Sequence, residues 1–142
     1  MYYLDANAFI YPALYEGPKA DGAGTLLRAI VAGEVGGATA ALTIDEVVYA
    51  IASQDNRETA IEQGKRLLEL PNVRILDVEG QHLLQALTAM EKHATFSPRD
   101  AIHYAVMVDR GIFSVASDDR DFDTIPDVER HPLESFSGGH PS

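Results

Sequence analysis

Short apolar segments alternate along this chain with longer segments of helical periodicity. Five short stretches predict β-strands, because they are apolar, aromatic or β-branched and end at polar or turn-forming residues. These stretches are 2–4, 37–41, 73–78, 112–116 and 128–131. Between them, apolar residues recur at spacings of three and four, which indicates helices. The expected helices are 8–14, with Asn7 as its N-cap, 20–31, 43–52, 58–70, 81–93 and 97–110.

The order of these elements predicts an α/β fold. Strands separated by helices are usually joined by crossover connections, which place them in a parallel sheet with helices on both faces. A chain of 142 residues is long enough for one such domain and short for two. We therefore expect a three-layer α/β/α sandwich with a central, mostly parallel sheet over residues 1–136. Residues 137–142 are expected to form a disordered tail.

Composition and charge limit the classes of function. Aspartate and glutamate number 22 and lysine and arginine 11, so the net charge is −11. This balance excludes a basic sleeve that binds nucleic acid simply by neutralising phosphates. The absence of cysteine excludes disulfides, thiolate metal sites and a cysteine nucleophile. No apolar run reaches the roughly 18 residues of a membrane span, and the first residues lack the basic flank of a signal peptide. We therefore expect a cytoplasmic protein without a membrane partner.

The acidic excess has two interpretations: a local site that needs many carboxylates, or an acidic surface that keeps the protein soluble or suits high salt. Glu58, Glu62 and Glu69 have the spacing of a solvated helix face. We attribute most of the excess to the surface. A site would need acids at specific places in the fold.

Several acids follow the predicted strands directly. Asp5 comes after the first strand, and Glu46 lies in the first turn of the helix after the second. Asp100 lies in the first turn of the helix 97–110. Because ligands of parallel α/β sheets bind beyond the carboxyl ends of the strands, we expect at least four carboxylates to converge at one edge. The strand 112–116 is followed by Ser117, Asp118, Asp119 and Asp121.

Such a cluster suits a divalent cation. Neighbouring carboxylates repel and raise one another's pKa, and a bound cation relieves this repulsion. Mg²⁺ and Mn²⁺ take oxygen ligands and are commonly held by a few carboxylates together with a substrate phosphate. One ion lowers the pKa of an attacking water, and a second stabilises the leaving oxygen at phosphorus. The pattern therefore indicates Mg²⁺- or Mn²⁺-dependent chemistry on a phosphate ester.

Each acid also has a purely structural explanation. Thr43 and Glu46 fit a capping box, and Ser97 and Asp100 fit the same pattern with aspartate in place of glutamate. The segment 118–123 fits an acidic turn, and Asp5 fits a residue that caps or polarises the helix after it. Capping does not explain why all the acids fall at the same edge of the sheet, so we favour the site.

The ordered set of motifs resembles the PIN-domain family, and within it the VapC-type ribonuclease toxins. Residues 2–10 look like the opening strand of that family with its first acid, and 98–107 look like its third motif. Residues 115–123 look like its fourth motif, in which a serine or threonine, an acid two residues later and Asp-Phe recur. Thr43 and Glu46 fit the second motif, which is the weakest of the four.

The resemblance implies a PIN α/β/α sandwich that hydrolyses RNA phosphodiester bonds with Mg²⁺ or Mn²⁺. It also implies a homodimer and a small antitoxin protein that holds the toxin inactive. The expected metal-binding and catalytic residues are Asp5, Glu46, Asp100 and Asp119, with Asp121 as a further ligand and Asn7, Thr43 and Ser117 in support. The three neighbouring acids Asp118, Asp119 and Asp121 leave the fourth ligand open by one or two residues.

Two other functions remain open at this point. Leu4-Asp5-Ala6-Asn7 is similar to the opening motif of haloacid-dehalogenase-like phosphatases, but Asn7 stands where those proteins have a second aspartate. A non-catalytic PIN-like interaction module is the other alternative, although keeping every acid without a metal would cost stability.

Three further side chains have more than one use. His103 shares a helix face with Asp100 and is expected to pack beside the site or support it. Tyr11 and Tyr15 lie four residues apart, which suits either base stacking or packing.

Overall fold

The computed structural model describes residues 1–138 of the chain. The strands are β1 (Tyr2–Leu4), β2 (Gly37–Ala40), β3 (Val73–Leu76), β4 (Ser114–Ala116) and β5 (Glu129–His131). The helices are α1 (Asn7–Leu14), α2 (Pro18–Val31), α3 (Ala41–Gln54), α4 (Arg57–Leu68), α5 (Gly80–Lys92) and α6 (Pro98–Asp109), with the 3₁₀ turns η1 (Arg120–Thr124) and η2 (Leu133–Phe136). Most of the expected tail, residues 139–142, lies outside the described residues, whereas the Ser137 and Gly138 amides donate to Glu134 and Phe136 carbonyls.

The five strands form one parallel sheet in the order β3-β2-β1-β4-β5, which confirms the predicted fold class. In the register of the sheet, Tyr3 of β1 lies opposite Ala38 of β2 on one side and Val115 of β4 on the other. The chain leaves β1 toward β2 and β3 and later crosses to β4 and β5. The order of strands therefore reverses at β1, and such a switch point opens a crevice beyond the carboxyl ends of the strands.

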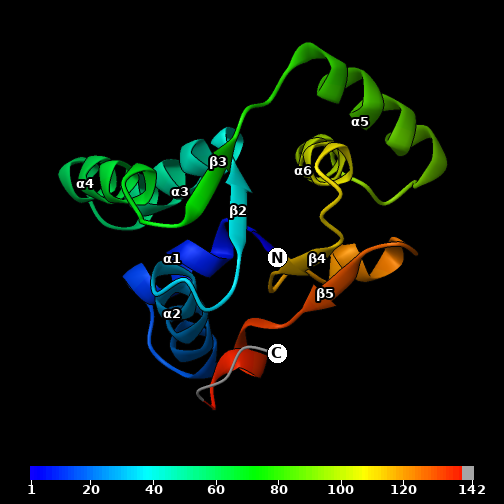
Figure 1. Ribbon diagram of the computed structural model, residues 1–142. Helices are drawn as coiled ribbons and strands as arrows, with labels where there is room; N and C mark the ends of the chain where they lie inside the picture. The colour runs from blue at the N-terminus through cyan, green and yellow to red at the C-terminus, as the bar shows by residue number, and fades with distance from the viewer. Residues whose placement is uncertain (139–142) are drawn as a thin grey trace.

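Helices cover both faces of the sheet (Figure 1). Successive side chains of a strand point to opposite faces. Tyr3 accordingly packs into the core beneath α5 and α6, while Tyr2 and Leu4 pack into the core beneath α1 to α4. All three side chains are nearly inaccessible to solvent. This burial fixes the register of β1 and thereby the position of the residue that follows it.

Three predicted helix starts needed correction: α2 begins at Pro18, two residues before its predicted start, and the starts of α1 and α3 also differ. Asn7 is the first residue of α1 and not its N-cap; the cap position is Ala6, without a side-chain cap. Helix α3 begins at Ala41, directly after β2, and not at Thr43. Glu46 therefore lies in the second turn of α3. The segment after β4 also differs from the expected loop, because it contains the 3₁₀ turn η1.

The C-terminal turn η2 packs closely against α2, and Gly22 makes this contact possible. A Cβ atom at this position would lie 1.9 Å from the Leu133 carbonyl oxygen.

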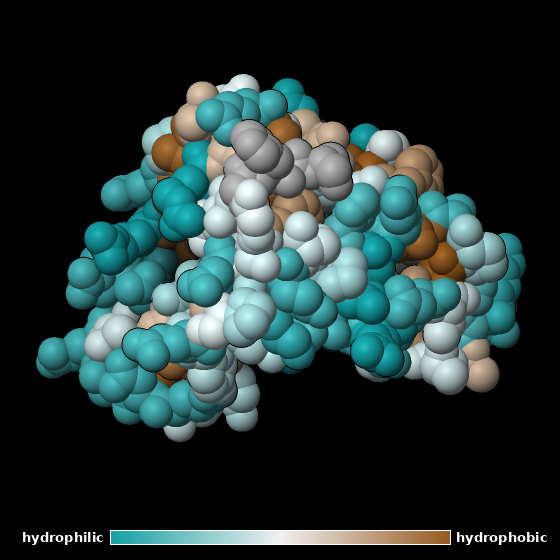
Figure 2. Space-filling model, turned by 90° about the horizontal axis from the view of Figure 1, so that it is seen from below, coloured by the Kyte–Doolittle hydropathy of each residue, from teal (hydrophilic) through white to brown (hydrophobic). Residues whose placement is uncertain are grey.

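Figure 2 shows a mostly hydrophilic surface on the face seen from below, with hydrophobic residues in small separate patches. Among the described residues, the helices are too short or too polar to cross a membrane.

Candidate active site

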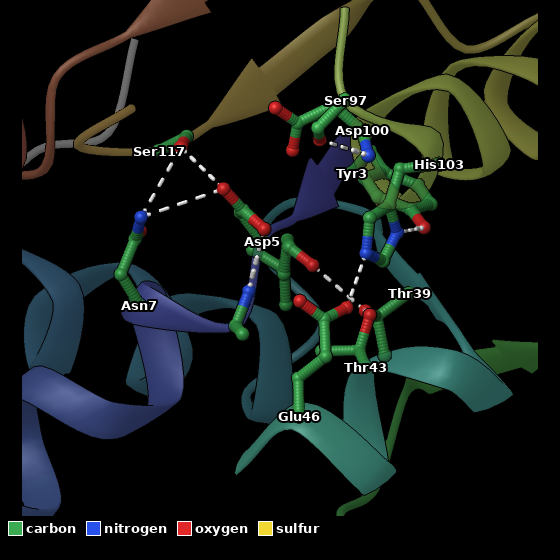
Figure 3. A network of polar contacts seen from close by, with 12 residues as sticks. Tyr3, Asp5, Asn7, Thr39, Thr43, Glu46, Ser97, Asp100, His103 and Ser117 are labelled. Atoms are coloured by element: carbon green, nitrogen blue, oxygen red, sulfur yellow. Dashed lines mark hydrogen bonds and ion pairs between the residues drawn. The ribbon is translucent and has the colours of Figure 1, made fainter. Parts of the chain in front are cut away.

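Asp5 lies at the centre of the polar network at the carboxyl edge of the sheet (Figure 3). It follows β1, and only 7% of its surface is exposed. Its Oδ1 accepts a hydrogen bond from the Ala6 amide at 2.8 Å, and its Oδ2 accepts one from the Ser117 hydroxyl at 2.6 Å. Burial raises the pKa of Asp5, while nearby His103 and the hydrogen bond from Ser117 act against that rise. A buried anion of this kind favours a cation beside it.

Ser117 and Asn7 connect the ends of β4 and β1. The Asn7 amide donates to Asp5 Oδ2 at 3.4 Å and to Ser117 Oγ at 3.3 Å. Its carbonyl oxygen accepts from the Asp118 amide at 3.2 Å. The Ser117 hydroxyl also accepts from the Asp119 amide at 2.9 Å. These bonds engage the Asn7 side chain fully, which explains why it does not cap α1.

Asp100, Asp119 and Asp121 form a group of acids next to this network. One carboxylate oxygen from each lies within 4.8 Å of the others. The pKa of Asp100 is raised to about 6, first by burial and then by the charge of Asp119. The Ser97 hydroxyl caps α6 by accepting from the Asp100 amide at 3.1 Å, as its sequence predicts. The Asp100 carboxylate is directed toward the side of the site where Asp5 and Ser117 lie (Figure 3).

Asp119 has a structural contact as well as a place in the acidic group. Its Oδ1 accepts from the Asp121 amide at 2.9 Å and so caps η1. The prediction of an acidic turn is therefore correct in its geometry. The turn and the site coexist, because the second oxygen of a carboxylate remains available when the first caps a turn.

Glu46 reaches the site from α3, but it lies outside the group of three close carboxylates. Its Oε1 is hydrogen-bonded to Nε2 of His103, whose Nδ1 is bonded to the Tyr3 hydroxyl. His103 is fully buried. Burial alone would lower the pKa of His103, but the bond to Glu46 and the neighbouring carboxylates raise it. His103 thus holds the Glu46 side chain from the protein interior.

The capping-box explanation of Thr43 and Glu46 is wrong. Thr43 is the third residue of α3, and its hydroxyl is hydrogen-bonded to the Thr39 hydroxyl at 2.7 Å. Thr39 also donates to the Leu4 carbonyl at 2.7 Å, which links the ends of β2 and β1. Thr43 therefore supports the site indirectly, through Thr39 and the carbonyl of Leu4, which directly precedes Asp5.

Asp118 differs from its two acidic neighbours. Its carboxylate accepts from the Tyr11 hydroxyl at 3.0 Å and forms an ion pair with Lys19 at 2.9 Å. The hydrogen bonds from Lys19 and Tyr11 outweigh partial burial and lower the pKa of Asp118. Because these contacts occupy its oxygens, Asp118 is a poor candidate for the fourth ligand, which leaves Asp119 and Asp121.

The donor set of this edge fits Mg²⁺ or Mn²⁺. Asp5, Asp100, Asp119 and Asp121 supply carboxylate oxygens from three different elements, and these metals prefer such ligands. The raised pKa values of Asp5 and Asp100 show that the charged carboxylates are poorly compensated by the protein alone. A divalent cation would supply that compensation.

Comparison with known proteins is consistent with this geometry. The PIN domain family matches residues 2–128, which is most of the chain. The chain belongs to the PIN-domain family. This membership confirms the resemblance inferred from the motifs and displaces the haloacid-dehalogenase alternative.

Individual PIN relatives cover nearly the whole chain. It is 27% identical over 130 residues to the VapC ribonuclease Mb1869c of Mycobacterium bovis, covering 92% of this chain and 98% of that one. The fold is similar to the Mycobacterium tuberculosis toxin VapC20, described as cleaving the sarcin-ricin loop, with a TM-score of 0.75, 18% identity and coverage of 91% and 98%. It is also similar to a chain of a toxin–antitoxin complex from Klebsiella pneumoniae, with a TM-score of 0.63, 16% identity and coverage of 90% and 95%.

A cavity of about 460 Å³ has none of the acids of the PIN site in its lining. Its lining comes from α1 to α4 and includes Phe9, Leu27, Val47 and Leu67. Because the described lining lacks carboxylates and includes the cationic Arg66, this cavity is unsuited to a metal ion.

Two features of the PIN site were not assigned from the sequence. The contact between His103 and Tyr3 joins residues 100 positions apart. The sequence indicated only that His103 shares a helix face with Asp100, and it did not identify Tyr3 as the partner. The ion pair between Lys19 and Asp118 spans 99 positions, and no local pattern indicated it.

Proposed function

We propose that this protein is a VapC-type endoribonuclease that hydrolyses RNA phosphodiester bonds with Mg²⁺ or Mn²⁺. Membership of the PIN family and likeness to a curated VapC ribonuclease over 98% of that protein's length support this activity. The observation that carries the proposal is the convergence of Asp100, Asp119 and Asp121 beside the buried Asp5, at the switch point of a parallel sheet.

The proposed roles follow from the contacts of each residue. The metal would be held by Asp5, Asp100, Asp119 and Asp121. Glu46 would be a further metal ligand at the edge of the site. When bound, a divalent ion activates a water for attack on phosphorus and stabilises the leaving oxygen. The metal-binding acids would be held in position by hydrogen bonds that involve Asn7, Thr43, Ser117 and His103.

The supporting residues orient the acids and reduce the cost of assembling them. Ser117 and Asn7 direct hydrogen bonds at the same Asp5 oxygen, so that carboxylate is held in one orientation. A hydrogen bond from His103 likewise restricts the orientation of the Glu46 carboxylate. Preorganised ligands avoid reordering when substrate and metal bind, which favours an in-line displacement.

The proposed partners are an RNA substrate, an antitoxin and a second copy of the chain, and the proposed compartment is the cytoplasm. The likeness to a toxin–antitoxin complex supports the antitoxin. Helix α5 supports the homodimer, because Leu83, Leu84 and Leu87 leave between 46% and 67% of their surface exposed. Light scattering of the purified chain, compared with a Leu84→Lys/Leu87→Lys variant, tests the dimer; a monomeric wild-type chain would refute it.

The decisive experiment is cleavage of a mixed RNA pool with Mg²⁺ or Mn²⁺, at low and high KCl, against an EDTA control. Asp100→Asn should abolish cleavage, whereas Asp77→Asn, at an exposed position after β3, should leave it unchanged. Absence of cleavage together with no metal-induced rise in melting temperature would refute the proposal and favour the non-catalytic interaction module. Metal binding without cleavage would retain the metal site and refute RNA as the substrate.

A further inference from the structure

A lysine and a tyrosine lie at the rim of the acidic site and share one acid. Lys19 Nζ lies 2.9 Å from Asp118 Oδ1, and the Tyr11 hydroxyl donates to Oδ2 of the same carboxylate at 3.0 Å. Lys19 Nζ also lies 5.7 Å from the centre of the Tyr11 ring. Two neighbours from different elements therefore restrict where the Lys19 ammonium can lie.

This position is close to the proposed metal ligands along a continuous set of contacts. The Asp118 backbone amide donates to Asn7 at 3.2 Å, and the Asn7 amide donates in turn to Asp5 Oδ2. Asp118 also directly precedes Asp119 in the chain. Two residues, Asp118 and Asn7, therefore connect the Lys19 ammonium to Asp5.

The local structure of α2 does not account for a lysine here. Lys19 is the second residue of the helix, where a positive charge opposes the helix dipole. The start of α2 is set without it, by Pro18 at the first position and by Gly17 with a φ of 114° before it. A residue that is unfavourable at its position in a helix often serves a functional contact outside that helix.

A cation at the rim of the site would reduce the repulsion between the acidic site and the phosphates of RNA. An RNA strand brings phosphates on both sides of the bond that is cleaved, and the site itself is acidic. Arg130 also lies close by, but its guanidinium is held by two bonds to Asp123 and one to the Ser117 carbonyl, and only 11% of its side chain is exposed. The Lys19 side chain is 43% exposed and can reach a ligand from solvent.

We infer that Lys19, held in place by Asp118 and Tyr11, binds a phosphate of the RNA strand next to the bond that is cleaved. This inference rests on the proposed ribonuclease function and assigns a substrate-binding residue to it. Asp118 is on this reading an anchor for Lys19 and not a metal ligand. Since a phosphate contact carries no sequence information, Lys19 would contribute equally to all RNA sequences.

The inference predicts a defined salt dependence. On single-stranded nucleic acid, each phosphate contact contributes a slope of about −0.7 to the logarithm of affinity against the logarithm of salt concentration. If the contribution of the contact vanishes at 1 M salt, losing it should lower kcat/KM about eightfold at 50 mM KCl and about threefold at 200 mM. An RNA that the wild-type chain cleaves, isolated from the mixed pool, serves as the defined substrate.

Four variants separate a phosphate contact from a structural ion pair. Lys19→Gln should show this loss mainly in KM, and Lys19→Arg should restore most of it. Because Lys19→Gln also leaves Asp118 uncompensated, the double variant Lys19→Gln/Asp118→Asn removes that charge. It should remain impaired, with its salt slope reduced by about 0.7. Lys65→Gln, at an exposed lysine of α4, is the matched control and should behave as wild type.

The outcomes distinguish this inference from the proposed function. If the wild-type chain cleaves RNA and the double variant regains its kcat/KM and salt slope, Lys19 only neutralises Asp118 and the inference is overturned. The same holds if Lys19→Gln matches Lys65→Gln at both salt concentrations. If the wild-type chain cleaves none of the RNAs with either metal, the proposed function fails, and the inference fails with it.

Discussion

Removing the charge of Asp100 should stabilise the metal-free protein while abolishing its activity. The pKa of Asp100 rises from 3.8 to about 6 in the folded chain because of burial and the neighbouring Asp119. Between these two values, the folded chain binds a proton that the unfolded chain has released. The free energy of unfolding therefore falls as the pH rises from about 4 to 6, and the whole loss is present at neutral pH.

The size of this effect follows from the shift. One pKa unit corresponds to about 1.4 kcal/mol, so the full shift sets an upper limit of about 3 kcal/mol. Asp100 is only partly buried, and solvent screens part of this energy. We expect Asp100→Asn to raise the free energy of unfolding by about 1 kcal/mol at pH 7.5. Because a gain of about 1 kcal/mol corresponds to a shift of only about 0.7 pKa unit, the gain should shrink to about two-thirds of that value at pH 4.5.

Urea unfolding in EDTA at pH 7.5 and 4.5 measures both quantities, with Asp77→Asn as the control for the loss of one negative charge from the surface. Added Mg²⁺ or Mn²⁺ should then stabilise the wild-type chain more than Asp100→Asn. The reasoning is refuted if Asp100→Asn is less stable than Asp77→Asn at pH 7.5 without metal. A gain that is the same at both pH values would refute it equally.

Three further results are expected. His103→Ala should lower the free energy of unfolding by about 3 kcal/mol in urea titrations, because it leaves Tyr3 and Glu46 without their partner; a loss under 1 kcal/mol would contradict this role. Gly22→Ala should lower it by at least about 1 kcal/mol, since its Cβ would meet the Leu133 carbonyl; wild-type stability would show that η2 moves away freely. The melting temperature should rise between dilute buffer and molar KCl, because salt screens the repulsion within a chain of net charge −11; a flat or falling curve would contradict it.

Local sequence patterns were sufficient for the elements and for much of the site. The apolar strands and the helical spacing identified every strand and helix of the sheet layers, since both signals are periodic over a few residues. Ser97 was recognisable as the cap of α6, because capping involves neighbours in the chain. Asp5 and Asp100 could be placed at the sheet edge from their positions after a strand and a cap.

Helix starts at α1 and α3 were less predictable. Asn7 and Thr43 are both good capping residues, yet each uses its polar atoms for contacts with residues far along the chain or on another element. At Asn7, tertiary hydrogen bonds outweigh the modest energy of a cap, whereas Thr43 is bonded to Thr39 four residues earlier, within a helix that already begins at Ala41.

The sequence by itself determined the parallel sheet, the acids at its carboxyl edge and the family to which the motifs belong. Only the tertiary structure distinguished Asp118 from Asp119 and Asp121, because the difference lies in Lys19, on a helix 99 residues earlier. The partners of His103 were decided in the same way, by the burial of β1 against α6. Local propensity depends on neighbours in the chain, whereas the charge and hydrogen bonding of a site depend on which distant elements the sheet brings together.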